Sequence, residues 1–287
     1  MNNQAQGLEQ MLSPVTMKII AITSGKGGVG KTNVSINLAV GLAKLGRSVV
    51  LFDADLGLAN VDIALGLKPK YDIRHVISGE RTLEEIIVEG PCGIRIVPAS
   101  SGVSGMASLT RQQQAGLIRT FSELSFAVDD LIVDTSAGIE TSVLTFASAC
   151  QEVVVVVCDE PSSITDAYAL IKVLSKEHEV RGFHILANMA DNDMQGRQLF
   201  DKISRVTDRF LDVQLGYLGA IPRDEYLRKA VQQQNAVVQS YPRSKSAQAL
   251  VKLASHVNDN LGSSDCHGGL GFFVERLIRV SGMVAEA

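Results

Sequence analysis

The stretch SGKGGVGKTN, residues 24–33, combines four glycines with two lysines, Lys26 and Lys31. An apolar run, residues 18–23, comes before it, and a run with helical periodicity, residues 31–45, comes after it. Glycines at such a turn let backbone N–H groups face inward around an anion, and the start of the following helix adds partial positive charge. The stretch therefore predicts a phosphate-binding loop between a buried strand and a helix.

Residues 25–32 match the pattern G-x-x-x-x-G-K-[ST] of a phosphate loop in full. In this loop the lysine, here Lys31, reaches the β- and γ-phosphates of a nucleotide, and the hydroxyl of Thr32 binds Mg²⁺ directly. The residues of the loop that we expect to bind the nucleotide are Gly25, Lys26, Gly27, Gly28, Val29, Gly30, Lys31, Thr32 and Asn33.

Short apolar runs alternate with longer amphipathic runs along the rest of the chain. Several of the short runs are continuous Val, Ile and Leu, which is typical of strands covered on both faces. This alternation predicts an α/β fold with a doubly wound, mostly parallel sheet and helices on both faces. The expected strands are residues 18–23, 48–53, 94–98, 130–134, 152–158, 183–188 and 214–221, and the expected helices are residues 31–45, 110–126, 162–176, 194–210 and 244–260.

Composition divides the chain into a polar leader (residues 1–16), an α/β domain (17–261), a glycine- and serine-rich linker (262–269) and a tail (270–287). The leader has neither the basic region nor the apolar core of a secretory signal, and no apolar run reaches the length of a membrane span. The four cysteines lie far apart, so their spacing predicts neither a disulfide framework nor a metal site. These features predict a cytoplasmic protein.

Carboxylates follow two of the expected strands. Asp134 ends an apolar run and is followed by Gly138, whose N–H group we expect to meet the γ-phosphate. Asp53 and Asp55 end another run. Parallel strands end at one edge of the sheet, where ligands bind, so we expect Asp55 and Asp134 to hold Mg²⁺ through water.

The second lysine of the loop, Lys26, lies too close to the phosphates for a passive role. Its side chain either folds back on its own nucleotide or extends to the nucleotide of a facing subunit, as an arginine finger does. The chemistry of the sequence does not choose between these roles.

The pattern K-G-G-x-G-K-[ST] at residues 26–32 resembles the deviant Walker A motif of the MinD/ParA family. This resemblance implies an ATP-bound homodimer in which Lys26 contacts the nucleotide of the partner. It also implies that Asp55 orients the attacking water, that Asp134 is the Walker B carboxylate, and that Lys26, Lys31 and Asp55 are catalytic. By the same resemblance, the adenine contacts are Asn188 and the backbone around Pro222 and Arg223.

Other members of that family fit the sequence less well. Iron–sulfur members need paired cysteines for a shared cluster, and Cys92 and Cys150 have no matching context here. Partition proteins bind DNA through basic surface, whereas this chain has a net charge of −4 and a pI near 5.8. Specific nucleic-acid binding is therefore not expected, although a small basic patch remains at Arg223, Arg228, Lys229 and Arg243.

The tail has the pattern of an amphipathic helix. Such a helix either lies in the interface of a bilayer or packs on the surface of its own domain. At 100° per residue, one arc holds Leu270, Phe273, Val274, Leu277, Ile278, Val280 and Val284.

Later segments resemble the flagellar-number regulators among the MinD-like ATPases. These segments are residues 53–62, 158–170, 206–212 and 272–277, and the resemblance extends over about residues 17–278. It implies a slow Mg-dependent ATPase whose ATP-bound dimer restrains a flagellar enhancer-binding transcription activator. It also implies contacts with a flagellar GTPase of the signal-recognition-particle type, with flagellar basal-body components and, reversibly, with the inner membrane or cell pole.

One segment departs from the pattern of these regulators. Their N-terminal motif D-Q-A-x-x-L-R, which stimulates the GTPase, reads N-Q-A-Q-G-L-E at residues 3–9. The alternatives that stay open are a division-site or partition ATPase of the same fold, and an ATP-gated interaction module that does not hydrolyse ATP. A small-molecule kinase would need an acceptor domain or lid, and the sequence shows neither.

Overall fold

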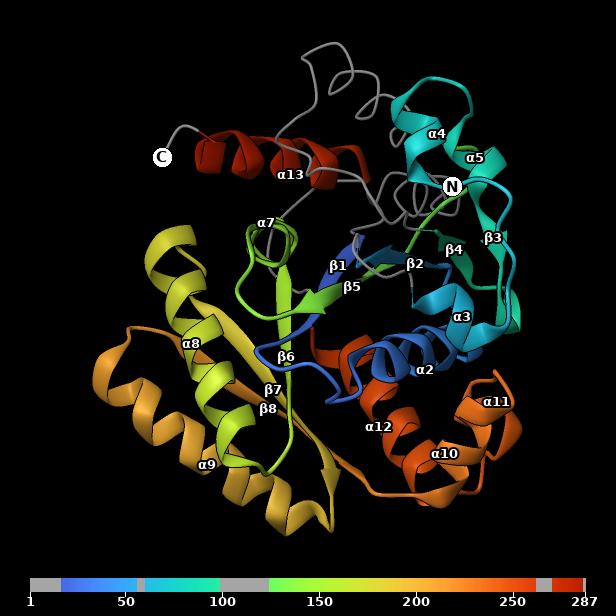
Figure 1. Cartoon of the computed structure of the whole chain (residues 1–287). Coiled ribbons are helices and arrows are strands. Elements are labelled where there is room, and N and C mark those ends of the chain that lie inside the picture. The colour runs from blue at the N-terminus through green and yellow to red at the C-terminus, as the bar shows by residue number, and fades with distance from the viewer. Residues whose placement is uncertain (1–16, 56–59, 99–123, 262–269, 286–287) are drawn as a thin grey trace, which may run out of the picture.

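The computed structural model describes residues 17–55, 60–98, 124–261 and 270–285 of the chain. One sheet of eight strands forms its centre, in the order β3-β4-β2-β5-β1-β6-β7-β8 (Figure 1). All pairs are parallel except β3 with β4, which are antiparallel. The strands are β1 (Lys18–Ser24), β2 (Val49–Ala54), β3 (Val88–Glu89), β4 (Arg95–Val97), β5 (Asp130–Ala137), β6 (Glu152–Val157), β7 (Gly182–Ala190) and β8 (Gln214–Pro222).

Helices cover both faces of this sheet. The described α-helices are α2 (Lys31–Lys44), α3 (Val61–Leu65), α4 (Ile73–Ile77), α5 (Leu83–Ile86), α7 (Thr141–Ala149), α8 (Pro161–His178), α9 (Asp193–Phe210), α10 (Glu225–Gln232), α11 (Val237–Ser240), α12 (Lys245–Asn260) and α13 (Leu270–Ala285), and a short 3-10 turn, η1 (Pro91–Gly93), precedes β4. Side chains alternate along each strand, so successive residues of β1 enter two different cores. Ile19 and Ala21 pack with α7, α8 and α9, whereas Ile20 and Ile22 pack with α2 and α12.

The expected α/β fold with a doubly wound, mostly parallel sheet is confirmed. Each expected strand is present, with ends that differ by at most three residues, and four of the five expected helices are present as α2, α8, α9 and α12. The fifth, residues 110–126, falls largely outside the described residues. Among the described elements that the sequence patterns did not predict are α7 and the antiparallel strand β3.

Helix α7 escaped prediction because it has no amphipathic pattern. All residues from Val143 to Ala149 are buried, and one side of the helix packs on the sheet. Helix α13 packs on α7 as well (Figure 1), with Phe273, Val274 and Leu277 at most 1% exposed. The Nη2 group of Arg276 donates to the carbonyl of Ser148, 2.9 Å away, near the end of α7. Of the two positions expected for the tail, the structure has the docked one.

Candidate nucleotide-binding site

The glycine-rich loop joins β1 to α2 at the carboxyl edge of the sheet. Gly28 and Gly30 have φ angles of 79° and 91°, which are costly for residues with a Cβ atom. Gly30 is the N-cap of α2, and no side chain caps that helix. A Cβ atom on Gly30 would lie 2.5 Å from Nδ2 of Asn188. The start of α2 therefore keeps backbone N–H groups available to an anion, in a turn that only glycine fits.

Lys31 lies at the base of this loop and is only 9% exposed. Burial lowers the pKa of its ammonium group, while the carboxylates of Asp134 and Asp55 act to raise it. A buried cation beside the start of a helix is the arrangement that a phosphate group complements.

Asp134 has one engaged and one unengaged carboxylate oxygen. Its Oδ1 atom accepts a hydrogen bond of 2.7 Å from the hydroxyl of Ser35, whereas its Oδ2 atom is buried with no partner among the described residues. Burial raises the pKa of this carboxyl to about 6, and bonds from Ser35 and Thr32 oppose the rise. The buried Oδ2 atom of Asp134 has no partner in the described part of the chain, and the hydroxyl of Thr32 lies beside this carboxyl. Both are oxygen ligands of the kind that Mg²⁺ prefers, and the ion keeps several of its waters.

Asp53 has a role that the sequence did not predict. Its Oδ1 atom accepts the N–H of Asp55 at 3.1 Å, and its Oδ2 atom accepts the N–H groups of Asn60 and Val61 at 3.0 and 3.1 Å. Burial, and then the charge of Asp134, raise its pKa to about 7. One carboxylate thus holds both ends of the segment that follows β2.

Asp55 is at the start of that segment. The Nδ2 group of Asn60 donates to its Oδ2 atom at 2.9 Å. The strand register places Asp53 beside Asp134 on neighbouring strands β2 and β5, so the structure brings Asp53, Asp55 and Asp134 to one edge of the sheet, as the sequence predicted for Asp55 and Asp134. The Asp-Ala-Asp pattern at residues 53–55 was the available indication of Asp53, but its contacts with residues 60 and 61 require the fold.

Lys26 forms an ion pair at the surface of its own chain. Its Nζ atom lies 2.6 Å from Oε2 of Glu160 and 2.9 Å from the hydroxyl of Ser162, at the start of α8. The hydrogen bond with Glu160 raises the pKa of Lys26. In the isolated chain the lysine is therefore paired on its own surface, and its contact with a partner's nucleotide stays a prediction.

Gly138 and Asn188 both form bonds within the chain. The N–H group of Gly138 donates to the carbonyl of Ser24 at 2.9 Å, so a contact with the γ-phosphate requires exchange of this bond. The Nδ2 group of Asn188 donates to the carbonyl of Val29 at 2.7 Å, and its Oδ1 atom accepts the N–H of Met189 at 2.9 Å. Asn188 thus joins the end of β7 to the phosphate loop.

Pro222 and Arg223 follow at the end of β8, the neighbour of β7. The Nε group of Arg223 donates to the carbonyl of Met189 and its N–H group to the carbonyl of Ala190, each at 2.9 Å. The residues expected around the adenine therefore come together at one end of the two strands.

Comparison with known proteins agrees with this geometry. A family model for ParA, described as NUBPL iron-transfer P-loop NTPase, matches residues 15–258. The chain belongs to the ParA/MinD family of P-loop NTPases. A solved structure of the same family, the septum site-determining protein MinD of Pyrococcus horikoshii with Mg-ADP, is 28% identical, has a TM-score of 0.67, and is matched over 86% of this chain and 98% of that chain.

Two flagellar proteins of the family match almost the whole chain. The antiactivator FleN of Pseudomonas aeruginosa is 54% identical over 272 residues, which are 95% of this chain and 97% of that protein. The flagellum site-determining protein YlxH of Helicobacter pylori is 34% identical, over 98% of this chain and 100% of that protein.

No helix in the described part of the chain is long and apolar enough to cross a membrane. Within the same residues, no three or more His, Cys, Asp or Glu side chains group to hold a metal ion. The fit for Mg²⁺ thus rests on Thr32 and Asp134 together with ligands from a nucleotide and water.

Proposed function

We propose that this chain is an ATP-dependent switch that regulates flagellar number. In its ATP-bound dimeric form it restrains a flagellar enhancer-binding transcription activator. The observation that carries the proposal is the 54% identity to the antiactivator FleN, which extends over 95% of the chain. The match to the flagellum site-determining protein YlxH supports the same process.

The proposed enzyme activity is slow, Mg-dependent hydrolysis of ATP. Lys31 and the N–H groups at the start of α2 hold the phosphates, Thr32 binds Mg²⁺, and Asp134 holds it through water. Asp55 orients the attacking water, and Asp53 fixes the backbone that carries Asp55 through its three N–H bonds. Mg²⁺, when bound, neutralises charge that develops on the phosphates.

The proposed partners follow from the same assignment. Besides the activator, they are a flagellar GTPase of the signal-recognition-particle type, flagellar basal-body components and the inner-membrane surface, which the C-terminal helix would reach after leaving α7. Residues 3–9 depart from the motif that stimulates the GTPase. The GTPase contact therefore has to be tested separately from the ATP-dependent switch. The proposed location is the cytoplasm, with reversible association with the inner membrane or the cell pole.

The test is the mass of the Asp55→Ala variant in solution. We expect a dimer with Mg-ATP, because hydrolysis no longer resets the dimer, and a monomer with Mg-ADP. Light scattering after size exclusion measures both. A monomer under both conditions would contradict the switch.

A division-site or partition ATPase is the alternative within the family, and MinD proteins are 31–34% identical to the chain. The phenotype of a deletion strain of the source organism distinguishes the two functions. The flagellar proposal requires excess flagella with normal division, and the alternative requires misplaced septa. Phosphate release then distinguishes an ATPase from a module that does not hydrolyse ATP.

A further inference from the structure

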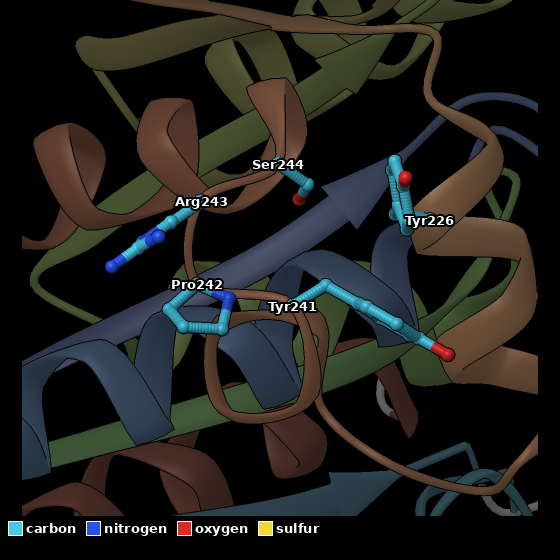
Figure 2. Close-up of a pocket in the computed structure, with 5 residues that line it drawn as sticks. All are labelled: Tyr226, Tyr241, Pro242, Arg243 and Ser244. Carbon is cyan, nitrogen blue, oxygen red and sulfur yellow. The ribbon is translucent and has the colours of Figure 1, made fainter.

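A surface pocket lies between the start of α10 and the turn that joins α11 to α12, and none of its lining residues belongs to the phosphate loop. It has a volume of about 330 Å³ and is lined by Tyr226, Tyr241, Pro242, Arg243 and Ser244 (Figure 2). The two tyrosines lie at one end, Arg243 lies at the other, and Pro242 lies between them.

The apolar end of the pocket is preformed. The rings of Tyr226 and Tyr241 have centroids 5.1 Å apart and are tilted by 47°. The hydroxyl of Tyr241 donates to Oε1 of Gln233 at 3.1 Å, which fixes that ring. Tyr226 is nevertheless 47% exposed. Rigid, exposed aromatic side chains supply contact area at low entropic cost and are typical of binding hot spots.

Two cations lie at the pocket, although the whole chain has a net charge of −4: Arg243 lines it, and Lys229 lies beside the ring of Tyr226. The sequence between Glu225 and Asp259 has five cations, Arg228, Lys229, Arg243, Lys245 and Lys252, of which Lys245 and Lys252 line a separate pocket with Asp191 and Asp193. None of the five forms an ion pair with another described residue. The ammonium group of Lys229 lies 5.1 Å from the ring centroid of Tyr226.

Asp224 and Glu225 come directly before Tyr226 in the sequence. Of these two acidic residues, Asp224 is engaged in helix capping. Asp224 accepts the N–H of Tyr226 and both the N–H and the hydroxyl of Ser246, each at 2.9 Å. Its charge is therefore shared among donors at the starts of α10 and α12. Arg243 and Lys229 therefore remain available to a ligand.

We propose that this pocket binds an acidic, extended segment of a partner protein. One aliphatic side chain of the segment packs on the exposed face of Tyr226, whose ring already contacts that of Tyr241, and carboxylates on either side of it pair with Arg243 and Lys229. Arg243 and the rings lie at opposite ends of the pocket, which suits an extended chain that contacts both. The proposal does not depend on flagellar function.

A peptide fits these features better than a nucleic-acid duplex. A duplex contacts proteins mainly through its phosphates and sugars. It has no apolar group that would enter a pocket of about 330 Å³. Two cations at the pocket of a chain with a negative total charge also do not form the basic stripe typical of DNA-binding domains.

Fluorescence anisotropy with labelled 12-residue peptides of Asp and Glu tests the proposal on the full chain with Mg-ADP. The peptides differ only at one central residue, Leu or Gly. We expect the Leu peptide to bind about tenfold more tightly than the Gly peptide, and Tyr226→Ala to remove this difference. We expect Arg243→Glu to weaken both peptides about tenfold, whereas Lys172→Glu, the same charge change on an exposed face of α8, leaves binding unchanged.

Three outcomes would overturn the proposal. Equal binding of the Leu and Gly peptides would reduce the pocket to non-specific charge. Equal effects of Arg243→Glu and Lys172→Glu would do the same. Tighter binding of a single-stranded oligonucleotide, lost in Tyr226→Ala, would make the pocket a nucleic-acid site. Unchanged affinity for labelled ADP in each variant verifies the fold and separates this result from the nucleotide-dependent switch.

Discussion

In the absence of nucleotide, the buried carboxylate of Asp134 lowers the stability of the folded chain. Its carboxyl is 1% exposed, and its Oδ2 atom has no partner among the described residues. Buried carboxylates without full pairing destabilise the charged form, which is why the pKa of Asp134 rises to about 6. Local stability is thus reduced where Mg²⁺ is expected to bind, and binding of the ion would offset the cost.

This cost predicts a pH dependence of stability. The pKa of Asp134 in the folded chain, about 6, lies above the ordinary value of 3.8, so the folded chain holds the proton more strongly than the unfolded chain. The resulting stabilisation is complete below about pH 4 and is lost as the pH rises through 6, and it is on the order of 3 kcal/mol. We expect Asp134→Asn without nucleotide to lose less thermal stability than the wild type between pH 4 and pH 7.

Differential scanning fluorimetry at each pH measures this difference. Asp201→Asn, an exposed change on α9, is the matched control and should follow the wild type. Parallel curves for Asp134→Asn and the wild type would show that the carboxyl does not titrate in this range. The same variant should bind Mg-ATP more weakly, which calorimetry checks.

At the scale of elements, α13 and α7 depend on each other. Helix α7 follows the strand that carries Asp134, and α13 covers the side of it that the sheet leaves open. The sequence predicted an apolar face on the tail but did not identify α7 as the surface against which it packs. An amphipathic pattern shows that a face is buried and does not identify its packing partner. Helix α7 lacks an amphipathic pattern because the sheet covers one side of it and α13 covers the other.

Truncation after Gly262 should therefore lower thermal stability, because it uncovers α7. Leu277→Ala, at a position that is 1% exposed, should lower the free energy of unfolding by about 2–4 kcal/mol, and Arg279→Ala, on the exposed side of α13, should have little effect. Chemical denaturation measures all three. Equal stability of the two point variants would mean that α13 does not stay docked in solution.

Co-sedimentation with vesicles containing anionic lipids adds a second readout for the truncated chain. If α13 also binds membranes, as proposed, truncation reduces co-sedimentation in addition to stability. Loss of stability with unchanged co-sedimentation would assign the helix a structural role alone.

For the whole molecule, the role proposed for Lys26 depends on a second copy of the chain. Its pairing with Glu160 and Ser162 keeps the ammonium group at the surface, beside the phosphate loop. Formation of the proposed dimer would exchange this pairing for contact with the partner's nucleotide. An exposed ion pair contributes little to stability, so its loss opposes the exchange only weakly.

Lys26→Ala should therefore retain affinity for ATP but lose dimerisation or turnover. Calorimetry measures binding, and size exclusion with light scattering and phosphate release measure the other two properties. Lys176→Ala, which removes an exposed lysine from the end of α8, is the control. A Lys26→Ala variant that dimerises and hydrolyses ATP at the wild-type rate would refute the role of Lys26 across the interface.

Local pattern alone determined the α/β class, the phosphate loop and the carboxylates at the ends of β2 and β5. Buried strands and glycine-rich turns have local signatures, because burial on both faces and positive φ angles restrict the residue at each position. Only the tertiary structure revealed how Asp53 holds Asn60 and Val61, how Glu160 pairs with Lys26, and where α13 packs. These contacts join residues on different elements, and their partners are set by how the sheet and helices pack, which no short stretch of sequence encodes.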